Sequence, residues 1–306
     1  MNKKKVVIVS ACRTAIGSLN KSLKNISAEN LGAAVIKDSI AKTKIEKKEV
    51  DEIILGQVLT GGTGQNPARQ ASIKSGLPVE TPAYVVNQVC GSGLRSIVSG
   101  FQSISSNNSN IIIAGGQENM SLAPHAIHLR DGKKLGDAKL IDTMIQDGLW
   151  DAFNEYHMGM TAENVAEKFQ ITRDEQDHFA LNSQEKALEA QKHNKFEKEI
   201  INFKIKSKKS EIDFSKDEHP RDGISLDSLS RLKPVFKKDG TVTAGNASGI
   251  NDGAAAVTLM DKEEAEKKGI NSLVSIKSWA SCGVDPALMG TGPIPSTKKA
   301  LKLAGW

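Results

Sequence analysis

The stretch Ala83-Tyr84-Val85-Val86-Asn87-Gln88-Val89-Cys90-Gly91-Ser92-Gly93-Leu94-Arg95-Ser96 runs from a valine-rich segment into a cysteine flanked by glycines. The apolar part predicts a strand over residues 85–89, because β-branched side chains are enriched in strands. Four apolar residues then follow at the i, i+3, i+4, i+7 spacing of one buried helical face: Leu94, Ile97, Val98 and Phe101. Cys90 is therefore expected where a strand ends and a helix begins.

That position suits a nucleophile. Backbone N–H groups without partners and the helix macrodipole favour an anion at a helix start, and the thiolate is the nucleophilic form of cysteine. Gly91 and Gly93 have no side chains, so a substrate carbonyl can approach the backbone closely. The alternative is a buried structural cysteine, because free cysteine is among the most buried residue types.

Composition indicates an ordinary globular protein. The chain has 306 residues, 39% hydrophobic and 25% charged, which is enough for two domains or one large layered unit. The formal charge is +5, but aromatic residues are only 4%, so the stacking platforms of single-strand nucleic-acid binders are missing. Glu197 and Glu199 interrupt the most basic stretch, residues 192–209, which favours a solvated face over a nucleic-acid patch. We expect no nucleic-acid partner.

The cysteines and the apolar runs indicate the compartment. Cys12, Cys90 and Cys282 are odd in number and lack metal-ligand spacing, which predicts neither disulfides nor a metal site. A reducing, cytoplasmic location fits this pattern. Residues 1–11 superficially imitate a signal peptide, but Arg13 follows where a small-residue cleavage site would lie, and a buried first strand is the better interpretation. No apolar run approaches the ~18 residues that a membrane span needs.

Strand and helix patterns alternate through the first 120 residues. Strands are predicted at four places, 6–10, 52–55, 85–89 and 111–114, and the apolar run at 6–10 is typical of a strand covered on both faces. Helices are predicted after Ser27, from Pro67 behind Asn66, and after Cys90. This order predicts an α/β fold with a largely parallel sheet.

The pattern changes over residues 117–249, where one clear helix, 173–192 after Thr172, stands among short elements. We interpret this region as an inserted domain. Strand character returns at 253–260, and a helix over 263–268 ends at Gly269. Finally, a new strand is expected over 272–281 and a new helix over 297–303.

The cysteine motif and six further segments together resemble the thiolase family, in its biosynthetic acetyl-CoA acetyltransferase branch. The matching segments lie in order along the whole chain: 13–17, 64–70, 115–121, 156–164, 243–249 and 289–293. The resemblance implies the thiolase fold, in which two similar α/β halves stack through their helices and a loop domain is inserted into the first. Here the first half would be residues 1–118 completed by 250–268. The CoA-binding insert would be 119–249, and 270–306 would begin an incomplete second half.

The resemblance also implies a reaction, the Claisen condensation of two acetyl-CoA molecules to acetoacetyl-CoA plus CoA, and its reversal by thiolysis. Cys90 would carry the acetyl group as a thioester. CoA would be substrate and product, and no cofactor would be needed. His157 and Met158 would line the pocket around the thioester and pantetheine, and Met289 would close the acyl pocket. The alternatives are a packed His–Met pair and a methionine that fills the core.

The same resemblance implies contacts along CoA. Ala244 and Ser248 would lie along the pantetheine arm, where the Ser248 hydroxyl can hydrogen-bond the amides. Arg221 and Ser228 would lie near the nucleotide end, with Arg221 facing phosphate. Their alternative role is that of a solvated surface pair.

The chain also departs from the family. In thiolases the second half supplies an Asn-Glu-Ala-Phe turn, a Gly-His-Pro loop and a Cys-x-Gly-Gly-Gly turn, and none of these occurs among the 306 residues. We therefore expect a fragment of a longer enzyme, largely inactive by itself. The alternative is a non-catalytic remnant that only binds CoA or a partner subunit.

Two further expectations come from the resemblance. A degradative 3-ketoacyl-CoA thiolase is the alternative activity, although Gly91 and the His157-Met158 pair resemble the short-chain type. A β-ketoacyl synthase fits less well, because its two catalytic histidines are not seen. The family also suggests a homotetramer, with residues 121–140 near the tetramer contact.

Overall fold

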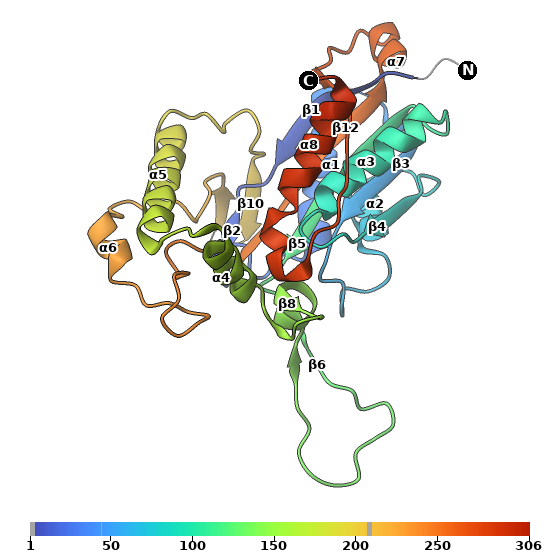
Figure 1. The fold of residues 1–306 in the computed structure, drawn as a ribbon. Coiled ribbons are helices and arrows are strands. Elements are labelled where there is room, and N and C mark those ends of the chain that lie inside the picture. The colour runs from blue at the N-terminus through green and yellow to red at the C-terminus, as the bar shows by residue number, and fades with distance from the viewer. Residues whose placement is uncertain (1–3, 44, 207–209) are drawn as a thin grey trace. The chain divides into compact units, whose positions relative to one another are not determined.

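The computed structural model describes residues 4–43, 45–206 and 210–306, which form two compact units (Figure 1). The first, here called the sheet unit, contains Met1–Met144, Glu197–Glu218 and Ile250–Ile276. The second, the insert unit, contains Ile145–Phe196, His219–Gly249 and Lys277–Trp306. Residues 197–218 belong to the sheet unit in this division, although the sequence-based prediction places them in the inserted domain. The domain boundaries at 118, 249 and 268 remain a prediction.

The sheet unit is built on one mixed sheet with the strand order β13-β1-β12-β5-β3-β4, and β2 pairs with β12. These strands are β1 (Val6–Arg13), β2 (Gly17–Ser18), β3 (Glu52–Gly56), β4 (Ala83–Val86), β5 (Ile111–Asn119), β12 (Asn251–Asp261) and β13 (Val274–Ser275). Only the β3–β4 and β3–β5 pairs are parallel among the described strands. The expectation of a largely parallel sheet is wrong, because β12 returns from the insert and pairs antiparallel with both β1 and β5.

Helices cover the sheet, and alternate side chains along each strand bury toward opposite faces. The helices of this unit are α1 (Ala28–Thr43), η1 (Lys47–Glu49), α2 (Pro67–Lys74), α3 (Ser92–Ser105) and α7 (Lys262–Lys267). Ile53 and Leu55 belong to the core that α1 completes. Ile54, between them, belongs to the core that α3 completes. The central strands are thus buried on both faces, as their continuous apolar runs predict.

Two predicted strands are shorter in the structure. The strand expected over 85–89 ends at Val86, because Asn87 starts a turn and its side chain accepts a hydrogen bond from the Val89 backbone at 2.8 Å. The strand expected over 272–281 is limited to β13, which pairs with β1 through two residues. Strand propensity describes single residues, so it could not predict that the rest of this segment pairs with no other described strand.

Two helix starts lie where the sequence predicts them, at Pro67 and Arg173, whereas α8 begins at Pro293, four residues before the predicted start. Asn66 caps α2 by accepting the Arg69 N–H, with Pro67 in the first turn. Thr172 and Glu175 form a capping box at the start of α5. Both motifs satisfy N–H groups that the helix itself leaves unpaired, which is why short-range sequence predicts them.

Two small hairpins complete the sheet unit: β6 (His125–Ala126) with β7 (Ile141–Asp142), and β10 (Phe203–Lys206) with β11 (Glu211–Phe214). The segment that carries the second hairpin is joined to β1 by reciprocal backbone bonds. Arg13 N–H donates to the Glu199 carbonyl, and Ile201 N–H donates to the Arg13 carbonyl, both at 2.8 Å.

The insert unit is mainly helical. Its elements are η2 (Met144–Leu149), β8 (Trp150–Asp151), β9 (Tyr156–His157), α4 (Met158–Phe169), α5 (Arg173–Lys192), α6 (Leu226–Ser230), η3 (Pro286–Thr291) and α8 (Pro293–Ala304). Strands β8 and β9 form a short hairpin, and η3 packs against α4. Within the described residues, no helix is long and apolar enough to cross a membrane.

Candidate active site

Cys90 lies in the turn between β4 and α3 and is exposed to solvent. Val89, just before it, has φ +47°, a left-handed conformation that a β-branched residue rarely adopts. Such backbone costs about 1–3 kcal/mol and persists where the surrounding structure enforces it, often at functional sites. Here the Ser92 hydroxyl holds the turn, accepting the Gln88 N–H at 2.9 Å and donating to the Val89 carbonyl. The turn presents Cys90 to solvent ahead of the helix.

Glycines on neighbouring strands let α3 start close to the sheet. A Cβ on Gly56, at the end of β3, would lie 2.5 Å from the Ser92 carbonyl carbon. A Cβ on Gly116, in β5, would lie 3.6 Å from the Gly93 Cα. Gly93 itself has open space where a side chain would project. The sequence-based site did not include Gly56, whose role depends on the tertiary approach of strand and helix.

Glu118 of β5 orders the chain that follows β3. Its carboxylate accepts the Val58 N–H at 2.8 Å and the Leu59 N–H at 3.2 Å. Burial raises the pKa of this carboxyl above its usual range. The carboxyl therefore fixes the segment after Gly56.

The other two cysteines have different surroundings. Cys12 is buried in β1, its sulfur 3.3 Å from both the Val35 carbonyl oxygen and the Ser39 hydroxyl. Burial raises its pKa to about 11, so its thiolate is scarce near neutral pH. Cys282 is half-buried. Of the three thiols, Cys90 is the accessible one at a helix start.

The other seven predicted site residues all belong to the insert unit, whereas Cys90 belongs to the sheet unit. They are His157, Met158, Arg221, Ser228, Ala244, Ser248 and Met289. The insert unit distributes them over α4, the segment from residue 219 to α6, the loop 241–249 and η3.

His157 and Met158 form the start of α4. His157 is the N-cap, and its Nδ1 accepts the Gly159 N–H at 3.0 Å, which places the ring proton of the neutral form on Nε2. The imidazole stacks on Phe236, with centroids 4.7 Å apart and planes 16° from parallel. Burial lowers the pKa of His157. The ring is therefore a neutral, oriented group near pH 7.

Met289 lies in η3, and contacts with α4 fix this element. The Asn164 amide donates to the Ala287 carbonyl at 3.0 Å and to the Tyr156 hydroxyl at 3.0 Å. The Met289 side chain itself is exposed. Helix α4 thus brings the segments of His157, Met158 and Met289 together.

Ala244 and Ser248 are exposed on the loop 241–249. The loop is internally bonded: Thr243 N–H donates to the Asn246 side-chain oxygen at 2.8 Å, and Ala247 N–H donates to the Thr243 carbonyl at 3.0 Å. Both residues are therefore presented by an ordered turn.

Arg221 and Ser228 are exposed, and each has a local structural role. The Arg221 backbone N–H donates to the Gln184 side chain of α5 at 2.9 Å. The Ser228 hydroxyl accepts the Ser225 N–H at 3.0 Å and donates to the Ser225 carbonyl at 2.7 Å, as part of the cap of α6. The guanidinium of Arg221 is the group in this pair that suits phosphate.

Two residues of the insert unit were missed by the sequence-based site. Phe236 stacks on His157, and Glu163 of α4 bonds the loop 241–249. Glu163 lies inside the segment 156–164 that resembles the family, and this resemblance was the sequence feature that could have indicated it. No sequence pattern marked Phe236, because its contact joins positions far apart in the chain.

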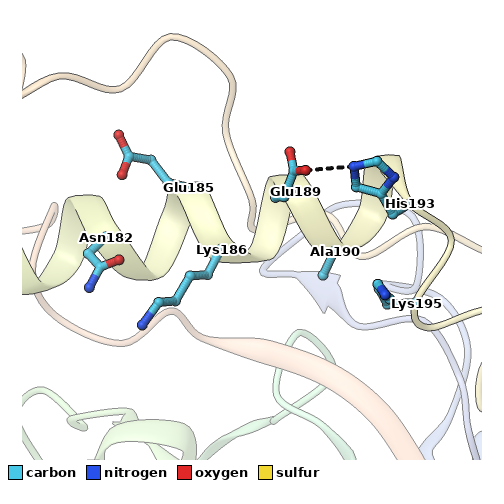
Figure 2. A pocket seen from close by; sticks show the side chains of 7 residues that line it. All are labelled: Asn182, Glu185, Lys186, Glu189, Ala190, His193 and Lys195. Atoms are coloured by element: carbon cyan, nitrogen blue, oxygen red, sulfur yellow. Dashed lines mark hydrogen bonds and ion pairs between the residues drawn. The ribbon is translucent and has the colours of Figure 1, made fainter.

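A separate open hollow of about 780 Å³ runs along α5 (Figure 2). It is lined by Asn182, Glu185, Lys186, Glu189, Ala190, His193 and Lys195. Glu189 and His193 pair at 2.6 Å one helical turn apart, while Glu185 points away from Lys186 (Figure 2). None of the predicted site residues lines it. Across the described ranges, no group of three or more His, Cys, Asp or Glu side chains could hold a metal ion.

Cys90 is an exposed thiol at a glycine-flanked helix start, an arrangement typical of enzymes that use a cysteine nucleophile. The model of the thiolase N-terminal domain matches residues 6–263. The chain belongs to the thiolase family.

The chain is similar to acetyl-CoA acetyltransferases of known sequence. It is 56% identical to that of Rhizobium meliloti (strain 1021) over 306 residues, which is 100% of this chain and 78% of the relative. It is 50% identical over 303 residues to the cytosolic acetyl-CoA acetyltransferase of Rattus norvegicus, covering 98% of this chain and 76% of the relative. The crystal structure of the Bacillus anthracis acetyl-CoA acetyltransferase matches with a TM-score of 0.97 at 40% identity, over 99% of this chain and 77% of that chain.

Proposed function

We propose that the chain functions as an acetyl-CoA acetyltransferase, forming acetoacetyl-CoA and CoA from two acetyl-CoA molecules and catalysing the reverse thiolysis. The observation that carries this proposal is the exposure of Cys90 in a strained turn at the start of α3. The names of the relatives in Rhizobium meliloti and Rattus norvegicus support the substrate.

In the first step, the Cys90 sulfur attacks the carbonyl carbon of acetyl-CoA. A new C–S bond to Cys90 forms, the C–S bond to CoA breaks, and CoA leaves as the thiol with the proton that Cys90 loses. In the second step, a second acetyl-CoA loses a proton from its methyl carbon, and that carbon attacks acetyl-Cys90. The thioester to Cys90 breaks and its sulfur regains a proton. Dividing the reaction in this way replaces one difficult step by two easier ones.

The insert unit supplies the proposed CoA contacts. His157 and Met158 line the pantetheine and thioester pocket, Ala244 and Ser248 follow the pantetheine arm, and Met289 closes the acyl end. The neutral, oriented His157 ring suits this role, because it offers an Nε2–H donor without a charge.

Arg221 and Ser228 face the nucleotide end of CoA. The exposed guanidinium of Arg221 can bind phosphate in a bidentate manner. No metal or organic cofactor enters the proposed steps.

The 306 residues include none of the family's His-bearing loop or second cysteine turn. General acid–base assistance is typically worth about 10²–10⁴-fold and an oxyanion hole about 10²–10³-fold. A polypeptide of these residues alone is therefore expected to condense acetyl-CoA slowly, while Cys90 still accepts an acetyl group.

The proposal includes a homo-oligomer in the cytoplasm. β4 is an outer strand with β3 as its partner among the described strands, and Tyr84 on it is exposed. The segment 121–140 also exposes apolar side chains, such as Leu135 at 92%. Both surfaces suit contacts between copies in a tetramer. The cytosolic name of the rat relative supports the location.

Acetyl labelling tests the function. The protein is incubated with acetyl-CoA, and the peptide containing Cys90 is analysed by mass spectrometry for an acetyl group. We expect labelling in the unmodified protein and in Cys282→Ser, and none in Cys90→Ser. Labelling that persists in Cys90→Ser would refute the assignment of the nucleophile.

A further inference from the structure

A buried carboxylate of α4 holds the loop 241–249. Glu163 is only 3% exposed, and its oxygens accept hydrogen bonds from three groups. The Thr241 N–H and Thr241 hydroxyl donate at 2.9 Å, and the Val242 N–H donates at 2.8 Å. Hydrogen bonds to an ionised acceptor are roughly twice as strong as neutral ones. These bonds therefore fix the loop on α4.

The backbone lies close to this carboxylate at Gly240, where there is no side chain. A Cβ on Gly240 would lie 2.4 Å from the Glu163 Oε1 atom. A side chain at residue 240 would displace the carboxylate, so the close approach requires glycine there. The contact therefore depends on two residues, the buried Glu163 and Gly240, which leaves room for its carboxylate.

A second buried carboxylate, Asp177 of α5, reaches the same loop. It is 3% exposed, and it accepts the Asn246 side-chain N–H at 3.0 Å and the Arg173 Nε–H at 2.8 Å. Asn246 in turn donates to the Thr241 carbonyl at 3.0 Å and accepts the Thr243 N–H at 2.8 Å. The loop is therefore bonded at both ends of its turn.

Arg173 extends the network to the end of α6. Its guanidinium donates to the Leu229 carbonyl at 2.7 Å and to the Leu232 carbonyl at 3.0 Å. Helix α6 carries Ser228, and α4 begins at Met158. One buried polar network thus joins α4, α5, α6 and the loop 241–249, the elements that carry most of the proposed CoA contacts.

We infer that Glu163 and Asp177 are positioning residues for coenzyme A, and that they set the affinity for the pantetheine arm by fixing the loop 241–249 on α4 and α5. Neither carboxylate contacts CoA in this role. The inference rests on the proposed function, because it takes Ala244 and Ser248 as pantetheine contacts. A preorganised loop binds more tightly, because less ordering is needed on association.

The test uses Glu163→Gln in the full chain. The amide keeps the shape but turns an –NH₂ group toward the donors of Thr241 and Val242. Glu167→Gln is the matched control, since Glu167 lies one turn further along α4, is 70% exposed and pairs with Lys237 at the surface. Three measurements are made on each variant: hydrogen–deuterium exchange of residues 241–249, the dissociation constant of CoA by calorimetry, and the rate of alkylation of Cys90.

For Glu163→Gln we expect exchange at Thr241 and Val242 to become at least about tenfold faster and CoA to bind about tenfold more weakly. Alkylation of Cys90 by iodoacetamide, a small reagent that needs no CoA site, is expected to stay unchanged. Glu167→Gln is expected to match the unmodified protein in all three. Unchanged exchange in Glu163→Gln would overturn the inference whatever the CoA result.

The failures of the two proposals are distinguishable. If the unmodified protein binds no CoA, the proposed function fails, and the positioning role fails with it. If that protein binds CoA and Glu163→Gln binds it equally well despite faster exchange, only the positioning role is overturned. Should Glu163→Gln not fold, Asn246→Ala replaces it, with Asn182→Ala of α5 as the control, and the same expectations apply.

Discussion

The imidazole of His157 lies on the ring of Phe236 with centroids 4.7 Å apart, and Gly159 makes this stacking possible. A Cβ on Gly159 would lie 2.2 Å from two carbons of the Phe236 ring. The ring therefore occupies the space that any other residue at 159 would need. A glycine in the first turn of a helix, normally unfavourable, here allows an aromatic ring to orient the N-cap histidine.

This contact reverses the expected effect of a Gly→Ala substitution on the stability of the protein. In a helix, Gly→Ala normally stabilises by about 1 kcal/mol. Gly159→Ala should instead destabilise the protein by about 1–3 kcal/mol, because the methyl group forces Phe236 away. Denaturant unfolding measures the change. Gly290→Ala is the control, since a Cβ there meets its nearest neighbour at an ordinary 3.9 Å. Equal stability of both variants would contradict the packing.

The N-cap role of His157 predicts a pH dependence. Burial holds its folded-state pKa below the usual value of about 6.5, so below that pH the unfolded chain binds more protons. The contribution of neutral His157 to stability is complete above the pKa of the unfolded state, and it is lost as the pH falls through the lower pKa of the folded state. Protonation of Nδ1 also breaks the bond from Gly159.

Stability of the unmodified protein should therefore fall more steeply between about pH 7 and pH 5 than that of His157→Asn. Asparagine caps a helix without titrating in this range. Thermal unfolding across this pH range compares the two proteins, and His128→Asn, at an exposed histidine, should keep the steep profile. Parallel profiles for the unmodified protein and His157→Asn would rule out His157 as the source.

Cys90 and Cys12 should react with an alkylating reagent at very different rates. Cys90 is exposed, whereas burial raises the pKa of Cys12 to about 11 and encloses its sulfur. Iodoacetamide at pH 8 should therefore modify Cys90 first and leave Cys12 unmodified in the folded protein. Peptide mapping over time measures the order, and unfolding in denaturant should make Cys12 react. Early modification of Cys12 in the folded protein would contradict its burial.

Local patterns in the sequence predicted the elements whose causes are local. The caps at Asn66 and Thr172, and the placement of Cys90 between a strand and a helix, follow from residues within a few positions of each other. The antiparallel insertion of β12 could not be predicted in this way. Its partners lie more than a hundred residues away, and its apolar run suits either strand direction.

The same limit applies to the candidate site. Motif resemblance selected residues with chemistry of their own, such as Cys90 and His157. It did not select Glu163 or Gly56, because a carboxylate and a glycine acquire their roles only through contacts with distant segments. The conformation of Val89 was hidden for the opposite reason, since valine suggests a regular strand and the structure places it in the left-handed region.

The last prediction concerns the segment 197–218, which Arg13 ties to β1. The Arg13 guanidinium binds both oxygens of Asp217 at 2.7 and 3.0 Å, and its Nε binds Glu199 at 2.6 Å. Lysine keeps the charge but lacks the planar fork, so Arg13→Lys cannot hold both acids in this geometry. We expect a loss of about 1–3 kcal/mol and faster hydrogen exchange over 197–218.

Arg231→Lys is the matched control, because Arg231 also pairs with a carboxylate, that of Asp227, but is 76% exposed. Solvent screens such a pair, and its replacement should change stability by less than about 0.5 kcal/mol. The loss of stability in Arg13→Lys should therefore be much larger than that in Arg231→Lys, because the Arg13 ion pairs are partly buried and join distant segments, whereas the Arg231 pair lies within one helical turn at the surface. If the two lysine variants lose equal stability, or if exchange over 197–218 does not change in Arg13→Lys, the Arg13 side chain does not hold the segment on β1.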